Sequence, residues 1–194
     1  MPRSDNLYEL PENIAAPVDD GACNHLMGMR LPSVALTSTA GRVVELAGLP
    51  GCVVIYCYPR TGRPGVDPPQ GWNEIPGARG CTPQACAFRD HYRELQRLGA
   101  QVFGLSTQDS DYQREAAARL HLPFELLSDT ALEFAQRLRL PTFEIDGMRL
   151  IKRLTLIAND GQIEKVFYPV FPPDKNAEEV IGWLAQALNQ KWSI

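Results

Sequence analysis

The stretch CVVIYCYP, residues 52–59, is an uninterrupted apolar run that ends at a proline. Its β-branched and aromatic residues favour a strand, and the absence of polar alternation is typical of a strand buried on both faces of a sheet. We therefore expect residues 52–58 to form the central strand of the fold, and Pro59 to end it.

The segments around this strand predict one mixed sheet with helices on its faces, an α/β fold. Before it, SVALTST and VVEL flank a glycine turn and predict a hairpin. After it, apolar spacing predicts a helix over 82–98, with Thr82 as N-cap and Pro83 as first residue. Farther along we expect strands over 101–106, 142–146, 149–158 and 162–170, a short strand or turn over 124–129, and helices over 109–120, 130–139 and 174–190.

Two segments lack regular periodicity. Residues 1–27 carry Asp, Asn and Pro, so we expect an extension that lies over the domain or is partly mobile, followed by one domain over 28–194. Residues 59–80 hold five prolines and five glycines. A loop of this length inside a compact domain is usually functional.

Composition excludes several classes of protein. The net charge of −4 argues against a nucleic-acid partner, and no apolar run is long enough to span a membrane. The first 21 residues have no apolar core of a signal peptide, and the cysteine count of five is odd. We therefore expect a cytoplasmic protein with reduced thiols rather than a secreted disulfide scaffold.

Two of the cysteines, Cys81 and Cys86, fall near the start of the predicted helix. Five helical residues separate two Cα atoms by about 8.6 Å, whereas a disulfide needs roughly 4.4–6.8 Å. These thiols can therefore bond only if the first turns unwind. The helix N-terminus and the nearby Arg79 favour a thiolate at Cys81, which predicts reactivity there. The plainer interpretation is two buried structural cysteines on an amphipathic helix.

The segment GCTPQACAFRD, residues 80–90, entered from a strand that ends in Tyr-Pro, resembles the peroxiredoxins of the Q type, the bacterioferritin-comigratory-protein-like group. The resemblance covers about residues 28–190, including LGAQVFGLSTQD, FELLSD and KRLTLIANDGQI. It implies a thioredoxin-like fold and a thiol-dependent peroxidase that reduces hydrogen peroxide or organic hydroperoxides. Cys81 would be the peroxidatic cysteine, and Cys86 would resolve its sulfenic acid as an intramolecular disulfide.

The same resemblance implies further site residues and partners. Arg153, in KRLTLIANDGQI, corresponds to the family's active-site arginine, and Pro59 would shield the pocket. A thioredoxin or a glutaredoxin-type protein would reduce the disulfide, and the chain would be a monomer or a weak homodimer. It implies no cofactor.

The chain departs from the family pattern Pro-x-x-x-Thr-x-x-Cys, because Glu74 and Ala78 stand at the Pro and Thr positions. We interpret VDPPQGWNEIPGARG, residues 66–80, as an insertion of about fifteen residues that forms a lid or partner surface or simply packs on the domain through Trp72. The hydroxyl that contacts the peroxide is then Thr61 or Thr82, or a backbone amide near Gly80 replaces it.

Other functions have less support in the sequence. A thioredoxin-class thiol–disulfide oxidoreductase usually carries Cys-x-x-Cys, and a copper-delivery protein on this fold carries Cys-x-x-x-Cys; neither spacing occurs here. A non-catalytic interaction module on a thioredoxin fold is supported by the altered Pro/Thr spacing. No glycine-rich phosphate loop follows a strand, and Cys23 with His25 lacks the further ligands of a metal site.

Overall fold

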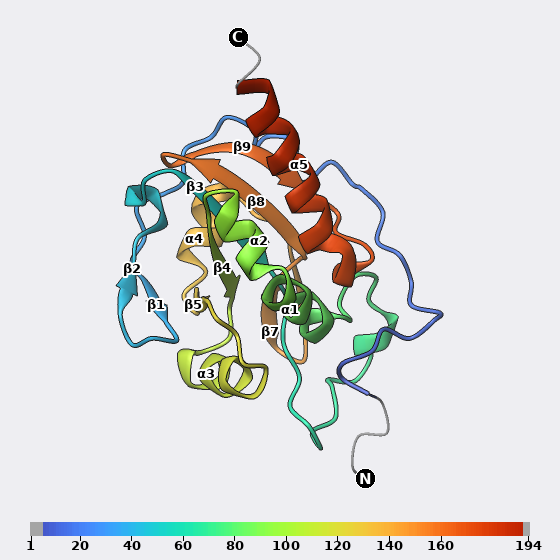
Figure 1. Ribbon diagram of the computed structural model, residues 1–194. Helices are drawn as coiled ribbons and strands as arrows, with labels where there is room; N and C mark the ends of the chain where they lie inside the picture. Colours follow the sequence, from blue (N-terminus) through green and yellow to red (C-terminus); the bar gives the residue numbers. More distant parts are fainter. Residues whose placement is uncertain (1–5, 192–194) are drawn as a thin grey trace.

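The computed structural model describes residues 6–191. Within these residues a seven-stranded mixed sheet forms the centre of the molecule, in the order β2-β1-β5-β4-β3-β8-β9 (Figure 1). Its strands are β1 (Leu36–Ser38), β2 (Val43–Val44), β3 (Cys52–Cys57), β4 (Ala100–Ser106), β5 (Glu125–Ser128), β8 (Leu154–Asn159) and β9 (Gln162–Phe167). The parallel neighbours β3, β4 and β5 are flanked by antiparallel strands on both sides. The predicted α/β fold with a mixed sheet is confirmed.

Strand β3 lies inside the sheet, hydrogen-bonded to β4 on one side and β8 on the other. Val53, Ile55 and Cys57 enter one hydrophobic cluster, whereas Val54 and Tyr56 enter another. This alternation buries both faces of the strand, as its apolar run predicts.

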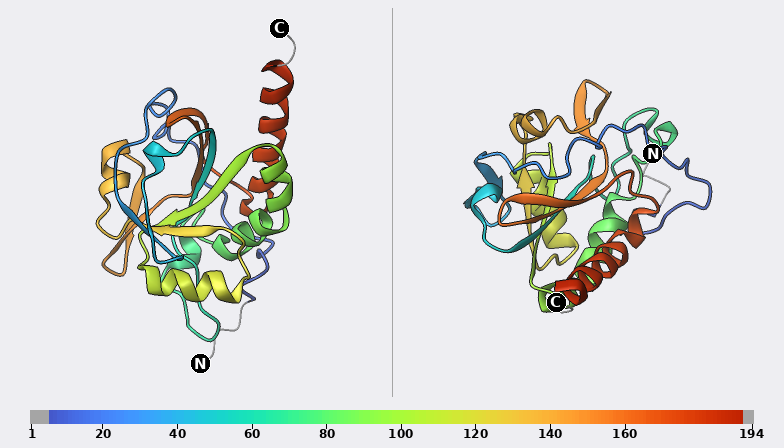
Figure 2. Two further views of the ribbon diagram at one scale, coloured as in Figure 1. Left: turned by 60° about the vertical axis from the view of Figure 1, so that its left-hand side comes forward. Right: turned by 90° about the horizontal axis from the view of Figure 1, so that it is seen from above.

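Helices cover both faces of the sheet. They are α1 (Cys81–Asp90), α2 (Tyr92–Arg97), α3 (Ser110–Arg119), α4 (Glu133–Leu138) and α5 (Asn176–Lys191). Figure 2 shows α1, α2 and α5 together on one side, with α4 on the other. No helix among residues 6–191 has the length and apolarity needed to cross a bilayer.

The position of α1 is set by aromatic packing on β3. The rings of Tyr56 and Phe88 stack with centroids 4.5 Å apart, and both side chains are fully buried. The neighbouring strand accommodates Tyr56 at Gly104, where a Cβ atom would lie 2.7 Å from the tyrosine oxygen. A larger residue at position 104 would therefore displace Tyr56, and with it the helix that begins at Cys81.

Two predicted elements are each divided in the structure. The helix expected over 82–98 is broken at His91 into α1 and α2. Apolar spacing continues across the break through the buried Phe88 and Leu95, so the sequence pattern gives no sign of it. The strand expected over 149–158 is also two strands. The first is β7 (Met148–Ile151), which pairs only with β6 (Thr142–Ile145) in a separate hairpin, and the second is β8 in the main sheet.

The N-terminal extension lies on the domain over its described part. Residues 6–27 contain no helix or strand, yet Cys23 and Leu26 are buried in the cluster on the α4 face of the sheet. Asp20 accepts hydrogen bonds from Lys152 Nζ at 2.9 Å and from the Tyr168 hydroxyl at 2.8 Å. The division of the chain at residue 27 stays a prediction.

Candidate active site

Helix α1 begins directly at Cys81. Its cap residue is Gly80, which has a φ of 99°, a conformation that side chains rarely adopt. A Cβ atom at Gly80 would lie 2.3 Å from Pro173 and 2.7 Å from Leu10. The predicted cap at Thr82 is therefore wrong by two residues, because the close approach of these side chains selects glycine as the turning point.

The sulfur of Cys81 lies against a guanidinium. Arg153 Nη2 donates to Cys81 Sγ at 3.1 Å, and the same nitrogen contacts the carbonyl oxygens of Ala78 at 3.2 Å and Arg79 at 3.0 Å. Both side chains are only 4% exposed. A buried cation at this distance stabilises negative charge on sulfur, which makes Cys81 the best-placed nucleophile among the described cysteines.

A buried polar network holds Arg153 in this orientation. Its Nη1 donates to Gln84 Oε1, and Gln84 Nε2 donates to Asn176 Oδ1 at 3.0 Å. The hydroxyl of Thr155 donates to the same oxygen at 2.6 Å. The network thus joins α1, β8 and α5 beneath the thiol, and its members other than Arg153 are fully buried.

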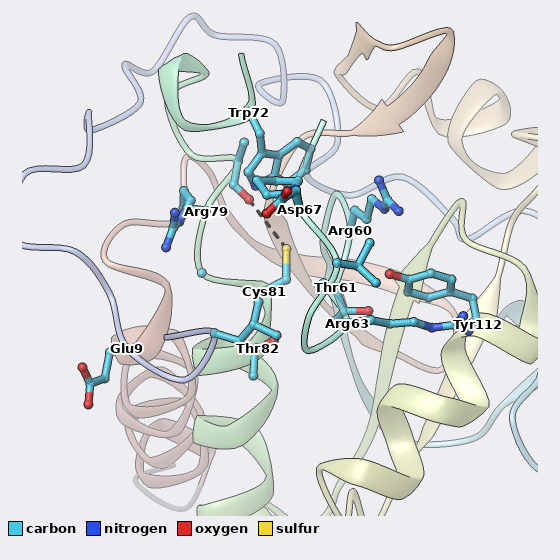
Figure 3. Close-up of a pocket in the computed structure, with 16 residues that line it drawn as sticks. Glu9, Arg60, Thr61, Arg63, Asp67, Trp72, Arg79, Cys81, Thr82 and Tyr112 are labelled. Carbon is cyan, nitrogen blue, oxygen red and sulfur yellow. Dashed lines mark hydrogen bonds between the residues drawn. The ribbon is translucent and has the colours of Figure 1, made fainter. Parts of the chain in front are cut away.

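The pocket at Cys81 encloses about 40 Å³, and its walls include Arg60, Thr61, Thr82 and Tyr112 (Figure 3). Gln108, which follows β4, holds Thr61 in place. The N–H and the hydroxyl of Thr61 both donate to Gln108 Oε1, at 2.9 and 3.1 Å. Its hydroxyl oxygen keeps lone pairs that can accept a hydrogen bond. Thr82 is also buried in the pocket wall, so both predicted hydroxyls lie beside Cys81.

Positive charge gathers around this pocket. The guanidinium carbons of Arg63 and Arg60 lie 4.0 and 5.6 Å from the centroid of the Tyr112 ring. Arg79 Nη1 donates to Asn73 Oδ1 at 2.8 Å. Glu9 and Asp67 also line the pocket, so three arginines face two carboxylates there.

Cys86 lies apart from this pocket. It is half-buried and lines a second pocket, together with Tyr8, Leu10, Pro83 and Asp90. Burial raises the pKa of Cys86, against the opposing effect of Arg89. In the helical arrangement burial thus disfavours the Cys86 thiolate, and the two thiols line different pockets.

A model of the redoxin family matches residues 26–181, most of the chain. The chloroplastic peroxiredoxin Q of Sedum lineare is 30% identical over 158 residues, which cover 81% of this chain and 76% of that protein. The chain belongs to the peroxiredoxins of the Q type, within the redoxin family. The corresponding protein of Oryza sativa subsp. japonica is 30% identical over 155 residues, 79% of this chain and 64% of its own length.

Solved structures show the same fold. The peroxidoxin BcpB of Mycobacterium tuberculosis superposes with a TM-score of 0.67 at 24% identity, over 82% of this chain and 96% of that one. A bacterioferritin comigratory protein of Xanthomonas campestris, described for alkyl peroxide reduction, gives a TM-score of 0.62 at 18% identity. That comparison covers 90% of this chain and 99% of the other. The expected thioredoxin-like fold is confirmed.

As a Q-type peroxiredoxin, the protein is a thiol-dependent peroxidase, an oxidoreductase whose substrates are a peroxide and a thiol reductant. Its structure brings three of the six predicted site residues to one pocket, namely Cys81, Thr61 and Thr82, and Arg153 contacts the sulfur of Cys81 without lining that pocket. Pro59 is buried but does not line this pocket, and Cys86 lines a different one.

The polar network was missed from the sequence of this peroxiredoxin. Gln84 stands three residues after Cys81, so helical spacing places it on the same face, and that signal was available. Asn176 lies 92 residues farther along the chain, and nothing in its own surroundings distinguishes it from other residues at a helix start.

Residues 66–80, which we interpret as an insertion and call the inserted stretch, pack on the β6–β7 hairpin. Trp72 lies in the 3₁₀ helix η2 (Trp72–Glu74) and forms a buried cluster with Ala78 and Leu150, 6.1 Å from the Phe143 ring between centroids. Trp72 also lines the Cys81 pocket. The tryptophan therefore anchors the loop by packing and closes one side of the site at the same time.

The other three cysteines lie in surroundings typical of structural residues. Burial raises the pKa of Cys23 to about 12 and that of Cys57 further, and Cys52 is half-buried at the start of β3. Among residues 6–191 no group of three or more His, Cys, Asp or Glu side chains is placed to hold a metal ion.

Proposed function

We propose that Cys81 is the thiol that attacks the peroxide in this peroxidase. The observation that carries this proposal is the 3.1 Å contact of Arg153 Nη2 with Cys81 Sγ at the first residue of α1. The thiolate attacks one peroxide oxygen, the S–O bond forms and the O–O bond breaks. The other oxygen takes a proton and leaves as water or an alcohol, and Cys81 becomes a sulfenic acid.

The groups around Cys81 assist the attack on the peroxide because of where they are placed. Arg153 stabilises the thiolate and the charge that develops on the departing oxygen, because it is already oriented by Gln84. Thr61 accepts a hydrogen bond from the peroxide, since its own proton is directed at Gln108. The Thr82 hydroxyl is the second partner, and Pro59 shields the site from behind.

Resolution follows in a changed conformation. The Cys86 thiol attacks the sulfenic sulfur, a Cys81–Cys86 disulfide forms, and the hydroxyl leaves as water. The first turns of α1 must unwind for this, because the helix separates the two Cα atoms by about 8.6 Å. Unwinding breaks the stacking of Phe88 on Tyr56 and the bond between Gln84 and Arg153.

The physiological reductant in this proposal is a dithiol protein, a thioredoxin or a glutaredoxin-type partner, which attacks the exposed disulfide and leaves both cysteines reduced. We place the enzyme in the cytoplasm, where a reducing thiol pool keeps the five cysteines free. We assign it a monomeric or weakly dimeric state, with neither nucleic acid nor membrane as partner.

Stopped-flow oxidation of the reduced protein tests the assignment. Hydrogen peroxide should oxidise the wild type in a rapid second-order reaction that is absent from Cys81→Ser. The Cys86→Ser variant should react at the wild-type rate but accumulate a sulfenic acid that a dimedone-type reagent traps. Oxidation of the wild type no faster than that of free cysteine would contradict the role of Cys81.

A further inference from the structure

Two segments that are distant in the sequence meet over the Cys81 pocket. Leu7 and Glu9 of the N-terminal extension line it on one side, and Val66, Asp67 and Trp72 of the inserted stretch line it on another. Figure 3 shows Trp72 and Asp67 beside the sulfur of Cys81, whereas Glu9 lies at the outer edge of the pocket. Much of the pocket wall therefore comes from outside the Tyr-Pro turn and α1.

Specific contacts hold both segments in place. Leu10 packs so closely on Gly80 that a Cβ atom there would lie 2.7 Å from the leucine side chain. The Tyr8 hydroxyl lies 3.4 Å from Arg119 Nη1, and Arg119 Nη2 donates to the carbonyl of Gly62 at 2.9 Å. On the other side, Trp72 is buried in its cluster against β6 and β7. The pocket walls are thus packed parts of the fold.

The space beside Cys81 is small. A cavity needs roughly 10–15 Å³ to hold one water, so about 40 Å³ holds only a few atoms of that size. Hydrogen peroxide has two non-hydrogen atoms and fits. Leu7 and Val66 are the two branched aliphatic side chains in the pocket lining that a branched or aromatic substituent of a larger hydroperoxide can contact.

We propose that the N-terminal extension and the inserted stretch make this peroxidase selective for hydrogen peroxide and other small hydroperoxides. Leu7 and Val66 are the specificity-determining residues. Both are aliphatic side chains at the pocket, and Val66 remains 48% exposed, so its truncation enlarges the entrance with little loss of packing. The proposal rests on Cys81 being the thiol that attacks the peroxide.

The extension supplies its own control residue. Leu7 lines the Cys81 pocket, whereas Val18 of the same extension does not and is 82% exposed. Truncation of Leu7 or Val18 to alanine removes an aliphatic side chain from the extension in both cases, but only the change at Leu7 alters the space that a peroxide occupies.

The test compares hydrogen peroxide, tert-butyl hydroperoxide and cumene hydroperoxide in stopped-flow oxidation of Cys81, which is independent of the later resolution step. The wild type should react at least about tenfold faster with hydrogen peroxide than with cumene hydroperoxide, a discrimination typical of a few excess carbon atoms. The Leu7→Ala/Val66→Ala double variant should raise the cumene-to-hydrogen-peroxide rate ratio about tenfold. Val18→Ala should leave that ratio unchanged.

Either of two results would overturn the proposal that the pocket selects small hydroperoxides. One is a wild type that reacts equally fast with all three peroxides, and the other is a double variant with the wild-type ratio. Loss of reaction with every peroxide in the wild type would instead refute the role of Cys81 itself, so the two failures are distinct. An unfolded fraction would lower the rate with hydrogen peroxide, whereas a widened pocket keeps that rate and raises the rate with cumene hydroperoxide, so the absolute rates separate the two causes of a raised ratio.

Discussion

Cys81 and Cys86 line different pockets of the molecule, although only five residues of one helix separate them. The first thiol lies beside Arg153, and burial raises the pKa of the second. The two thiols are therefore in distinct environments as long as α1 is helical, and a bond between them requires that helix to open.

The opening of α1 should be visible in amide hydrogen exchange. In the reduced protein the amide of Gln84 donates to the Gly80 carbonyl at 3.0 Å, and the amide of His91 donates to that of Ala87 at 3.1 Å. We expect peroxide treatment to increase exchange across residues 81–90 of the wild type, because the disulfide cannot form in a helix. The Cys86→Ser variant, treated in the same way, should keep its protection. Equal exchange in the two oxidised proteins would contradict the unwinding.

The arginine beside the sulfur provides a second prediction. Arg153 binds Gln84 through one terminal nitrogen and Cys81 through the other, a forked geometry that a lysine cannot reproduce. Arg153→Lys should therefore slow the oxidation of Cys81 by about 10²-fold, the usual loss when one oriented donor is removed. Stopped-flow rates with hydrogen peroxide measure it.

Arg79 is the matched comparison for that variant. It also lines the Cys81 pocket, and its guanidinium donates to Asn73 Oδ1 in η2. Arg79→Lys keeps the charge and should change the rate much less than Arg153→Lys does. If both substitutions slowed oxidation equally, charge alone rather than the fork of Arg153 would govern the reaction.

The fold follows from local features of the sequence to a large extent. The apolar run of β3, the hairpin before it and the helical spacing of Phe88 and Leu95 suffice for the mixed sheet and the reactive helix, because each is a short-range pattern. Arg153 was placed through a family resemblance, and the structure puts it at the sulfur.

What the sequence did not predict depends on tertiary contact. The strand expected over 149–158 divides at Lys152 and Arg153 because the β6–β7 hairpin leaves the main sheet, and the Lys152 amide bonds to the Pro141 carbonyl instead. Gly80 replaces Thr82 as the cap because Pro173 and Leu10 approach it. Neither partner is near in sequence, so local propensity carries no signal for them.

The buried network beneath the thiol should contribute to stability as a unit. Gln84→Ala removes one partner of both Arg153 and Asn176, and leaving a buried polar group unsatisfied costs about 1–3 kcal/mol. We expect Gln84→Ala and Asn176→Ala each to lower the free energy of unfolding, as measured in urea. The double variant should show a coupling of about 0.5–3 kcal/mol. Strictly additive losses would mean that the two amides do not act on each other.

The ionisation of Cys86 gives a prediction with a definite pH dependence. Burial raises the pKa of this thiol, so at any given pH its thiolate fraction is below that of a free cysteine. A free thiol is half ionised near about pH 8.5. In the Cys81→Ser variant, alkylation of Cys86 by iodoacetamide should therefore still increase with pH beyond that value. Peptide mass spectrometry separates Cys86 from the other cysteines.

Arg89 acts against burial, because its positive charge favours the Cys86 thiolate. Arg89 also donates to Asp90 Oδ1 at 2.8 Å and to the Leu120 carbonyl at 2.9 Å, which holds it next to the helix. Arg89→Gln should move the alkylation profile of Cys86 to higher pH, since the loss of a nearby cation disfavours the anion. Arg93→Gln, which removes an exposed charge on the following helix, should leave the profile in place. A profile that levels off below about pH 8 in the Cys81→Ser protein would show instead that Cys86 is readily ionised in the helical state, contrary to the separation of roles between the two thiols.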